Sequence, residues 1–183
     1  MRDTGFDEYL MWAYDHNLPE GVKHPGKENG EKASRFWHPS LIRSGEYLPT
    51  TPDDYGPDMF NEFVIDFAKR NKKKPFFVYY TSVLTHGPHL ETPNPDEPGQ
   101  RWPAGFKSNL EYLDHLMGNL FDGLKTEGLD ENTYVIFIGD NGTGSDGKGT
   151  LTELGARVPC IIRGPGVQRG LVSRALGDLT DIM

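Results

Sequence analysis

Two short apolar stretches that run straight into polar residues constrain the fold of this chain more than any other feature. Residues 76–80 read Phe-Phe-Val-Tyr-Tyr, and residues 134–138 read Tyr-Val-Ile-Phe-Ile. Short, continuous runs of aromatic and β-branched residues are typical of strands that are buried on both faces, whereas half-exposed strands alternate apolar and polar residues. The sequence therefore predicts a sheet that is covered on both sides.

Amphipathic helices are predicted before and between these two strands. Apolar residues recur at helical spacing from Pro57 until Pro75 ends the segment, and a second such segment is closed by Gly128. The expected elements are strands near 76–82, 134–138 and 158–162, and helices near 57–70 and 106–126. This alternation of helix and strand predicts the α/β class, with a mostly parallel sheet flanked by helices.

The chain divides by composition into two parts of one domain. Residues 1–56 are rich in glycine, proline and charge, and their aromatic residues follow no clear period. We expect them to form an irregular segment that borders a pocket, next to an α/β core formed by residues 57–183. The last residues, Asp178–Met183, read as a helix that stops within its first turn. Such an ending is typical of a truncated segment.

Composition excludes several classes of function. The chain has 27 acidic and 19 basic residues, a net charge of −8, which argues against a protein that binds nucleic acid through clustered basic residues. No apolar run approaches the ~20 residues of a membrane helix, so no membrane span is expected. Residues 1–4 lack the apolar stretch of a signal peptide. The single cysteine, Cys160, excludes an internal disulfide and a cysteine-based zinc site.

Polar residues gather where the predicted strands end. The first strand leads to His86 and His89, and the second leads to Asp140 and Asn141, with Lys148 soon after. Ligands of parallel α/β sheets bind beyond the carboxyl ends of the strands, so these groups are expected to face one crevice. Carboxylate and amide oxygens suit Ca²⁺ or Mg²⁺, while lysine and histidine can bind an oxyanion.

Each of these signals also has a simpler interpretation on its own. Asn141–Gly142 is the strongest two-residue turn signal, and an isolated histidine such as His86 is more often an ordinary surface or core residue. The Gly147–Thr150 segment resembles the end of a phosphate-binding loop but lacks the first glycine at the right spacing. Only the combination at two matching strand ends favours a functional site.

Three blocks of the sequence run in the same order as in a known family. The blocks are Pro75–Tyr80 with Thr85–Pro88, Glu131–Phe137 with Asp140–Gly142, and Gly147–Pro159. They resemble three segments of the sulfatase (arylsulfatase-like) family. The first block resembles P-F-F-hydrophobic-Y with P/T-H-x-P, and the second resembles N-T-hydrophobic with D-N-G. The third resembles G-K-G-T-x-x-E-G-G-x-R-V-P. That family belongs to the alkaline-phosphatase-like superfamily. The resemblance implies an alkaline-phosphatase-like core, of which this chain is an internal part.

The resemblance also implies roles for four residues. Asp140 and Asn141 match the late metal ligands of the family, usually for Ca²⁺ and less often for Mg²⁺. Lys148 matches the lysine that contacts the sulfate group, and His86 matches the histidine near the ester oxygen. In the family, a formylglycine hydrate attacks the sulfur of a small sulfate ester or a sulfated glycan. Family members are often periplasmic, secreted or lysosomal.

The chain departs from the family pattern at the nucleophile. It contains no Cys/Ser-x-Pro-x-Arg motif, and Cys160 is followed by Ile-Ile-Arg, so it cannot be the formylglycine precursor. Formylglycine is therefore expected in the missing N-terminal part. Leu154 also stands where a glycine is usual. We expect a sulfatase fragment that is inactive alone. Two alternatives stay open, a phosphodiesterase or phosphonate hydrolase of the same superfamily, and a non-catalytic binding protein with a sulfatase fold.

Overall fold

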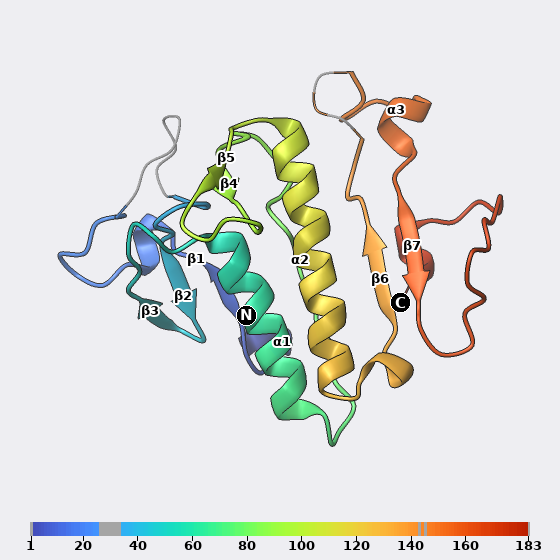
Figure 1. Cartoon of the computed structure of the whole chain (residues 1–183), viewed down its shortest axis with the longest axis horizontal. Helices are drawn as coiled ribbons and strands as arrows, with labels where there is room; N and C mark the ends of the chain where they lie inside the picture. Colours follow the sequence, from blue (N-terminus) through green and yellow to red (C-terminus); the bar gives the residue numbers. More distant parts are fainter. Residues whose placement is uncertain (1, 26–33, 143, 145, 183) are drawn as a thin grey trace. The chain divides into compact units, whose positions relative to one another are not determined.

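The chain forms two compact units in a computed structural model that describes residues 2–25, 34–142, 144 and 146–182 (Figure 1). The N-terminal unit is Met1–Glu127 and the C-terminal unit is Gly128–Met183. The boundary in composition after residue 56 lies within the N-terminal unit. Among the described residues, no helix has the length and apolar character needed to cross a membrane.

A small antiparallel sheet lies near the start of the N-terminal unit. It contains β1 (Leu10–Trp12), β2 (Leu41–Arg43) and β3 (Glu46–Leu48), paired in that order. Ser44 and Gly45 connect β2 to β3 with φ angles of 50° and 100°. Two positive φ angles in a two-residue loop match the twist of the flanking strands, which explains the tight hairpin. Part of the segment expected to be irregular is therefore regular structure.

Two long helices confirm the helical periodicity of the sequence. Helix α1 (Gly56–Asn71) has a proline in its first turn, and α2 (Phe106–Thr126) buries a stripe of leucines that includes Leu116, Leu120 and Leu124. The helices lie side by side (Figure 1). Gly123 permits this close packing, because an added Cβ would lie 2.9 Å from Ile65 Cγ2.

The first predicted strand has no strand partner among the described residues. Residues 75–83 are assigned no regular structure, yet Phe77 and Tyr79 are 74% and 72% exposed while Phe76, Val78 and Tyr80 are partly buried. This period of two is typical of extended backbone with one packed face and one bare face. A strand requires a hydrogen-bonded neighbour, so the strand predicted at 76–82 is not confirmed.

A short two-stranded ladder lies between the histidine-bearing loop and α2 in the sequence. Strands β4 (Thr92–Pro93) and β5 (Arg101–Trp102) pair antiparallel, with Thr92 opposite Trp102. Thr92 is fully buried, and β4 also contacts α2. This ladder therefore fixes the chain that follows the histidine-bearing loop.

The C-terminal unit contains the other two predicted strands, but they pair with each other. Strand β6 (Val135–Ile138) and β7 (Cys160–Arg163) are antiparallel, and the four-residue helix α3 (Glu153–Ala156) lies between them in the sequence. A parallel pair needs a crossover connection, usually a full helix. Here the chain contains only the short helix α3 between the two strands, and Gly139 N binds Pro159 O next to the start of β7. All strand pairs of the described residues are antiparallel, so the predicted parallel sheet is not confirmed.

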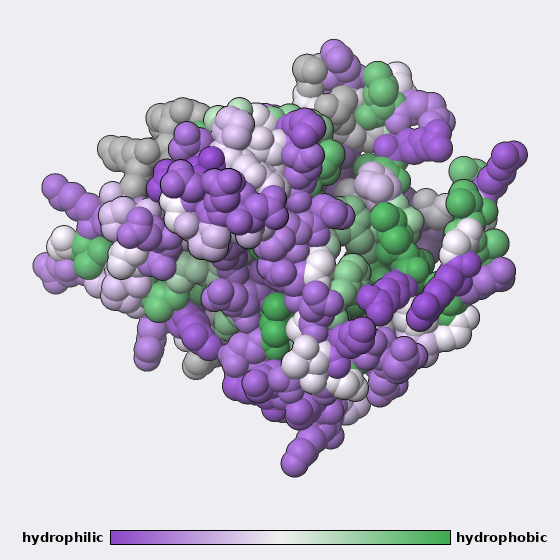
Figure 2. Space-filling view, viewed as in Figure 1, coloured by the Kyte–Doolittle hydropathy of each residue, from purple (hydrophilic) through white to green (hydrophobic). Residues whose placement is uncertain are grey.

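Apolar side chains of this two-stranded ladder remain exposed. Ile136 and its cross-strand partner Ile162 are 42% and 48% exposed, and Ile161 is 61% exposed. Successive residues of a strand point to opposite faces, so both faces of the ladder present an apolar side chain. Figure 2 shows hydrophobic residues gathered over these strands.

Candidate functional site

Three of the four predicted site residues lie on one loop of the C-terminal unit, between β6 and β7. Asp140 and Asn141 follow β6 directly, and Lys148 lies further along the same loop. Two backbone hydrogen bonds close the loop: Gly139 N donates to Pro159 O at 3.0 Å, and Gly142 N donates to Gly155 O at 3.1 Å. One closed segment therefore holds a carboxylate, an amide and an ammonium group.

Glycines determine how this loop folds. An added Cβ on Gly142 or Gly147 would collide with the carbonyl oxygen of Leu154, and one on Gly155 would collide with the carbonyl oxygens of Gly147 and Thr150. Backbone segments therefore approach each other where only glycine fits. Leu154 contributes its carbonyl to this packing and leaves its side chain 59% exposed.

Asp140 and Asn141 offer oxygen atoms suited to a hard cation. The Asp140 side chain is exposed and has no hydrogen bond or ion pair with the described residues. Asn141 Nδ2 donates to the Gly142 carbonyl at 3.2 Å, which leaves Oδ1 available as a ligand. Carboxylate and amide oxygens are the type of ligand that Ca²⁺ prefers. Ca²⁺ takes about six to eight oxygen ligands, so these two side chains supply only part of a site. Within the described part of the chain, no group of three or more His, Cys, Asp or Glu side chains forms a metal site.

Lys148 lies at an exposed turn of the loop. Thr150 closes this turn with two hydrogen bonds to the Gly147 carbonyl, from its backbone N at 2.9 Å and from Oγ1 at 2.8 Å. Gly149 follows the lysine with a φ of 81°, a backbone conformation that favours glycine. The Lys148 ammonium has no ion pair with any residue that the structure describes. It is therefore available to bind an anion.

A cavity of about 410 Å³ borders Asn141. Its lining residues are Asn141, Gly142, Glu153, Leu154, Arg157, Val158 and Pro159. The lining contains a long, solvent-exposed ion pair. Arg157 Nη1 lies 3.8 Å from Glu153 Oε2, and both side chains are strongly exposed. Asn141 thus lies beside a hollow that is lined by apolar residues and by one acidic and one basic side chain.

His86, the fourth predicted residue, lies in the N-terminal unit on the loop of residues 84–91. Its backbone N donates to Val83 O at 2.8 Å, and its ring Nδ1 lies 2.5 Å from the Gly87 carbonyl oxygen. A carbonyl only accepts hydrogen bonds, so Nδ1 is the donor and Nε2 is the nitrogen that can exchange a proton. The side chain is exposed. The structure therefore gathers Asp140, Asn141 and Lys148 on one loop and places His86 in the other unit.

The His86 loop has no regular structure and is held by side chains from distant segments. Arg35 Nη2 donates to Gly87 O at 3.4 Å, and Trp37 Nε1 donates to Glu91 O at 2.9 Å. Asn109 Nδ2, from α2, donates to Leu90 O at 2.8 Å. Sequence analysis missed these three residues, because nothing in a single sequence relates residues 35 and 37 to a loop that follows about fifty positions later.

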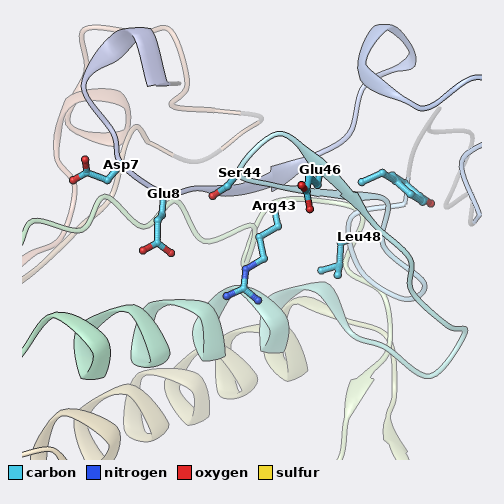
Figure 3. A pocket seen from close by; sticks show the side chains of 7 residues that line it. Asp7, Glu8, Arg43, Ser44, Glu46 and Leu48 are labelled. Atoms are coloured by element: carbon cyan, nitrogen blue, oxygen red, sulfur yellow. The ribbon is translucent and has the colours of Figure 1, made fainter.

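The N-terminal unit also has an open cavity of about 430 Å³ (Figure 3). Its lining residues are Asp7, Glu8, Arg43, Ser44, Glu46, Tyr47 and Leu48. Arg43 points toward α1 (Figure 3), where it lies 3.7 Å from Asp66 and over the ring of Phe63. Arg70 binds both oxygens of Glu8 at 2.7 Å, and this hydrogen bonding lowers the pKa of the Glu8 carboxyl. These charges link the small sheet to α1, and no residue predicted for the site lines this cavity.

The sequence as a whole is similar to one family of enzymes. A family model described as Sulfatase matches residues 4–183. N-acetylgalactosamine-6-sulfatase of Canis lupus familiaris is 28% identical over 203 residues, which cover 97% of this chain and 37% of that protein. Arylsulfatase A of Homo sapiens is 32% identical over 127 residues, which cover 62% of this chain and 25% of that protein. The chain thus spans less than two fifths of the length of these relatives.

Solved structures share the fold. A crystal structure of Ps i-CgsB in complex with k-i-k-neocarrahexaose superposes with a TM-score of 0.66 at 21% identity, over 90% of this chain and 41% of that chain. A second crystal structure of Ps i-CgsB gives a TM-score of 0.64 at 24% identity over the same shares. At this level of identity, the likeness shows the fold.

Proposed function

Because this chain belongs to the sulfatase family, a family of sulfuric ester hydrolases, we propose that it supplies the metal- and sulfate-binding loop of an enzyme that cleaves sulfate esters. One observation carries the proposal. Asp140, Asn141 and Lys148 share a loop that is closed by hydrogen bonds, and all three side chains are exposed. Such an arrangement presents ligands for a cation and a binding group for an anion from one closed loop.

The chemistry of sulfate-ester cleavage assigns a task to each side chain. Negative charge develops on the leaving oxygen, and groups that are already in place lower the cost of that charge. Lys148 holds a sulfate oxygen through its ammonium group. His86, when doubly protonated, gives the Nε2 proton to the leaving alcohol. A Ca²⁺ ion bound by Asp140 and Asn141 would neutralise part of the charge on the sulfate group.

The proposed enzyme needs more than the residues of this chain. The chain has no Cys/Ser-x-Pro-x-Arg motif, so the formylglycine nucleophile would come from a segment outside residues 1–183. We also propose that the complete domain has the alkaline-phosphatase-like core with a mostly parallel sheet. The exposed side chains of Phe77 and Tyr79 and of the β6–β7 ladder support this proposal, because helices cover both faces of a parallel sheet and would bury such side chains.

The proposed substrate is a sulfate ester of a small molecule or a sulfated glycan. One relative is N-acetylgalactosamine-6-sulfatase, whose alignment covers 97% of this chain. Its name refers to a sulfated amino sugar. One structural neighbour was crystallised with a neocarrahexaose. The net charge of −8 supports a partner other than nucleic acid.

Sulfate release from an aryl sulfate tests the proposed function. The 183-residue chain alone should show no turnover, whereas the protein that also contains the nucleophile should hydrolyse the ester. In that active protein, Lys148→Ala should lower turnover by ~10²–10³ without a change in metal content. Lys74→Ala is the matched control, because Lys74 is also exposed.

Three results would contradict the proposal. Turnover by the chain alone that is lost with Lys148→Ala would place a nucleophile within residues 1–183. Hydrolysis of phosphate diesters in place of sulfate esters would favour a phosphodiesterase. Failure of the nucleophile-containing protein to hydrolyse any ester would favour a non-catalytic binding protein.

A further inference from the structure

Two side chains from distant parts of the sequence share one backbone acceptor beside the candidate acid. His86 Nδ1 and Arg35 Nη2 both donate to the carbonyl oxygen of Gly87, at 2.5 Å and 3.4 Å. A carbonyl oxygen has two lone pairs and can accept both hydrogen bonds. The orientation of this single carbonyl therefore connects the position of the imidazole to that of the guanidinium.

Arg35 reaches the loop from a well-packed position. Its guanidinium carbon lies 5.5 Å from the centre of the Trp12 ring and 5.9 Å from the centre of the Phe36 ring. Phe36 is fully buried, and Trp12 belongs to β1. A guanidinium held against two aromatic rings loses little additional entropy when it forms a hydrogen bond. Arg35 is thus a fixed reference point, whereas the loop of residues 84–91 has no strand or helix to define it.

We propose that Arg35 is a positioning residue for His86, because it holds the Gly87 carbonyl where it accepts the Nδ1 proton and so keeps Nε2 directed outward. The proposal rests on the proposed function of His86 as the group that protonates the leaving alcohol. A neutral imidazole can carry its proton on either nitrogen, and the hydrogen bond made by one nitrogen decides which. The guanidinium acts by fixing the direction of the shared carbonyl, without touching the substrate.

The other two side chains that hold the loop bind carbonyls later in its sequence. Trp37 Nε1 binds the carbonyl of Glu91, and Asn109 Nδ2 binds the carbonyl of Leu90. Both hold the end of the loop that leads into β4. Removal of the indole N–H should therefore loosen the loop end without a large change at His86. Trp37→Phe deletes this donor and keeps an aromatic ring next to Tyr55, so it is a matched control.

The tautomer of His86, measured by ring ¹⁵N NMR on the 183-residue chain, tests the proposal without any need for activity. The Nδ1–H form should predominate in the unaltered chain at a pH where the ring is neutral. Arg35→Gln should raise the ratio of the Nε2–H form to the Nδ1–H form by roughly 2- to 12-fold, the equivalent of one ordinary hydrogen bond. Arg35→Lys, which keeps the charge, should restore part of the difference, and Trp37→Phe should leave the ratio unchanged.

His89 provides an internal control in the same spectra. Its Nε2 lies 3.0 Å from the Thr85 carbonyl oxygen, so its tautomer should not respond to Arg35→Gln. An unchanged His86 ratio in Arg35→Gln would overturn the proposal. Equal changes at His86 and His89 would also overturn it, because they would indicate general loosening of the loop.

Kinetics of the nucleophile-containing protein separate this inference from the proposed function. Arg35→Gln should lower kcat for esters of poor leaving groups by about 10-fold, with KM nearly unchanged and little effect on good leaving groups. Equal losses for both kinds of ester would contradict a role in positioning the acid. If the tautomer responds as expected but no ester is hydrolysed, the proposed function fails while the coupling of Arg35 to His86 stands.

Discussion

The hydroxyl group of Tyr112 donates a 2.7 Å hydrogen bond to Asp58 Oδ1 and so joins α2 to the first turn of α1. Burial raises the pKa of the Asp58 carboxyl from 3.8 to about 6. The hydrogen bond from Tyr112 acts in the opposite direction, and the charge of Glu62 adds to the increase. The helix pair therefore contains a carboxyl group that changes charge near neutral pH.

This shift predicts a stability that depends on pH. A carboxyl with a raised folded-state pKa contributes stability that is fully present below pH 3.8 and is lost as the pH rises through about 6. We expect the free energy of unfolding, measured by urea titration, to fall by up to about 3 kcal/mol across this interval. Asp58→Asn should remove this dependence, since the amide oxygen still accepts from Tyr112 and has no charge to desolvate.

The control for this experiment is Asp114→Asn, which alters an exposed carboxyl on α2. It should retain the same fall in stability between pH 4 and pH 7. If Asp58→Asn and the unaltered chain show the same pH profile, the Asp58 carboxyl is not the group responsible.

The close packing of glycines in the C-terminal loop predicts that a larger residue there will destabilise the loop. Gly147→Ala should distort the loop, because its Cβ would collide with the Leu154 carbonyl, and overpacking of this kind costs about 1–3 kcal/mol. Amide hydrogen exchange within residues 146–156 should accelerate. Gly144→Ala should have little effect, since its Cβ would meet no atom within 4 Å. Equal protection of these amides from hydrogen exchange in the two variants would show that the loop does not require the close approach of Gly147 to the Leu154 carbonyl.

The oxygen donors of the same loop predict weak binding of calcium. The chain alone should bind Ca²⁺ with a Kd of about 10⁻³ M or weaker, because two side chains supply only part of the coordination that Ca²⁺ requires. Asp140→Asn should abolish the chemical-shift changes caused by Ca²⁺ in NMR titrations. Asp146→Asn, an exposed carboxylate on the same loop, should preserve them. Identical losses in both variants would indicate nonspecific attraction by negative charge.

The exposed ladder predicts self-association of the isolated chain. Ile136 and Ile162 form an exposed cross-strand pair, and unpaired strand edges with apolar side chains promote edge-to-edge contact. Ile162→Lys should reduce the apparent mass measured by analytical ultracentrifugation. Leu176→Lys, which changes an exposed residue outside the ladder, should not. A monomeric chain that unfolds in one sharp transition would contradict this prediction.

Local patterns in the sequence predicted the helices well and the strand pairing poorly. The apolar periodicity before Asn71 and before Thr126 depends on neighbours within each helix, so it identifies α1 and α2 without knowledge of the rest of the molecule. Pairing depends on which backbone lies alongside. The apolar run at residues 134–138 identified β6 but could not reveal that β7 returns antiparallel to it. The three-residue strands β1–β3 are too short to show any period.

The candidate site shows the same difference between local and distant information. Asp140, Asn141 and Lys148 lie close in sequence, and both the strand-end pattern and the family resemblance indicated them. Arg35 acts on a loop 52 positions away, through a backbone carbonyl that has no side-chain identity to detect. Contacts of this kind leave no pattern in a single sequence.

Because backbone hydrogen bonds at Gly139 and Gly142 close the loop, we expect binding of the proposed cation and binding of the proposed anion to be energetically coupled. A cation that orders Asp140 and Asn141 also reduces the conformational entropy of the segment that bears Lys148, so the anion then loses less entropy on binding. The coupling is reciprocal, since the anion raises the affinity for the cation by the same factor. If both proposed ligands bind this loop, sulfate and calcium titrations performed separately should therefore underestimate the affinity that each ligand has in the presence of the other.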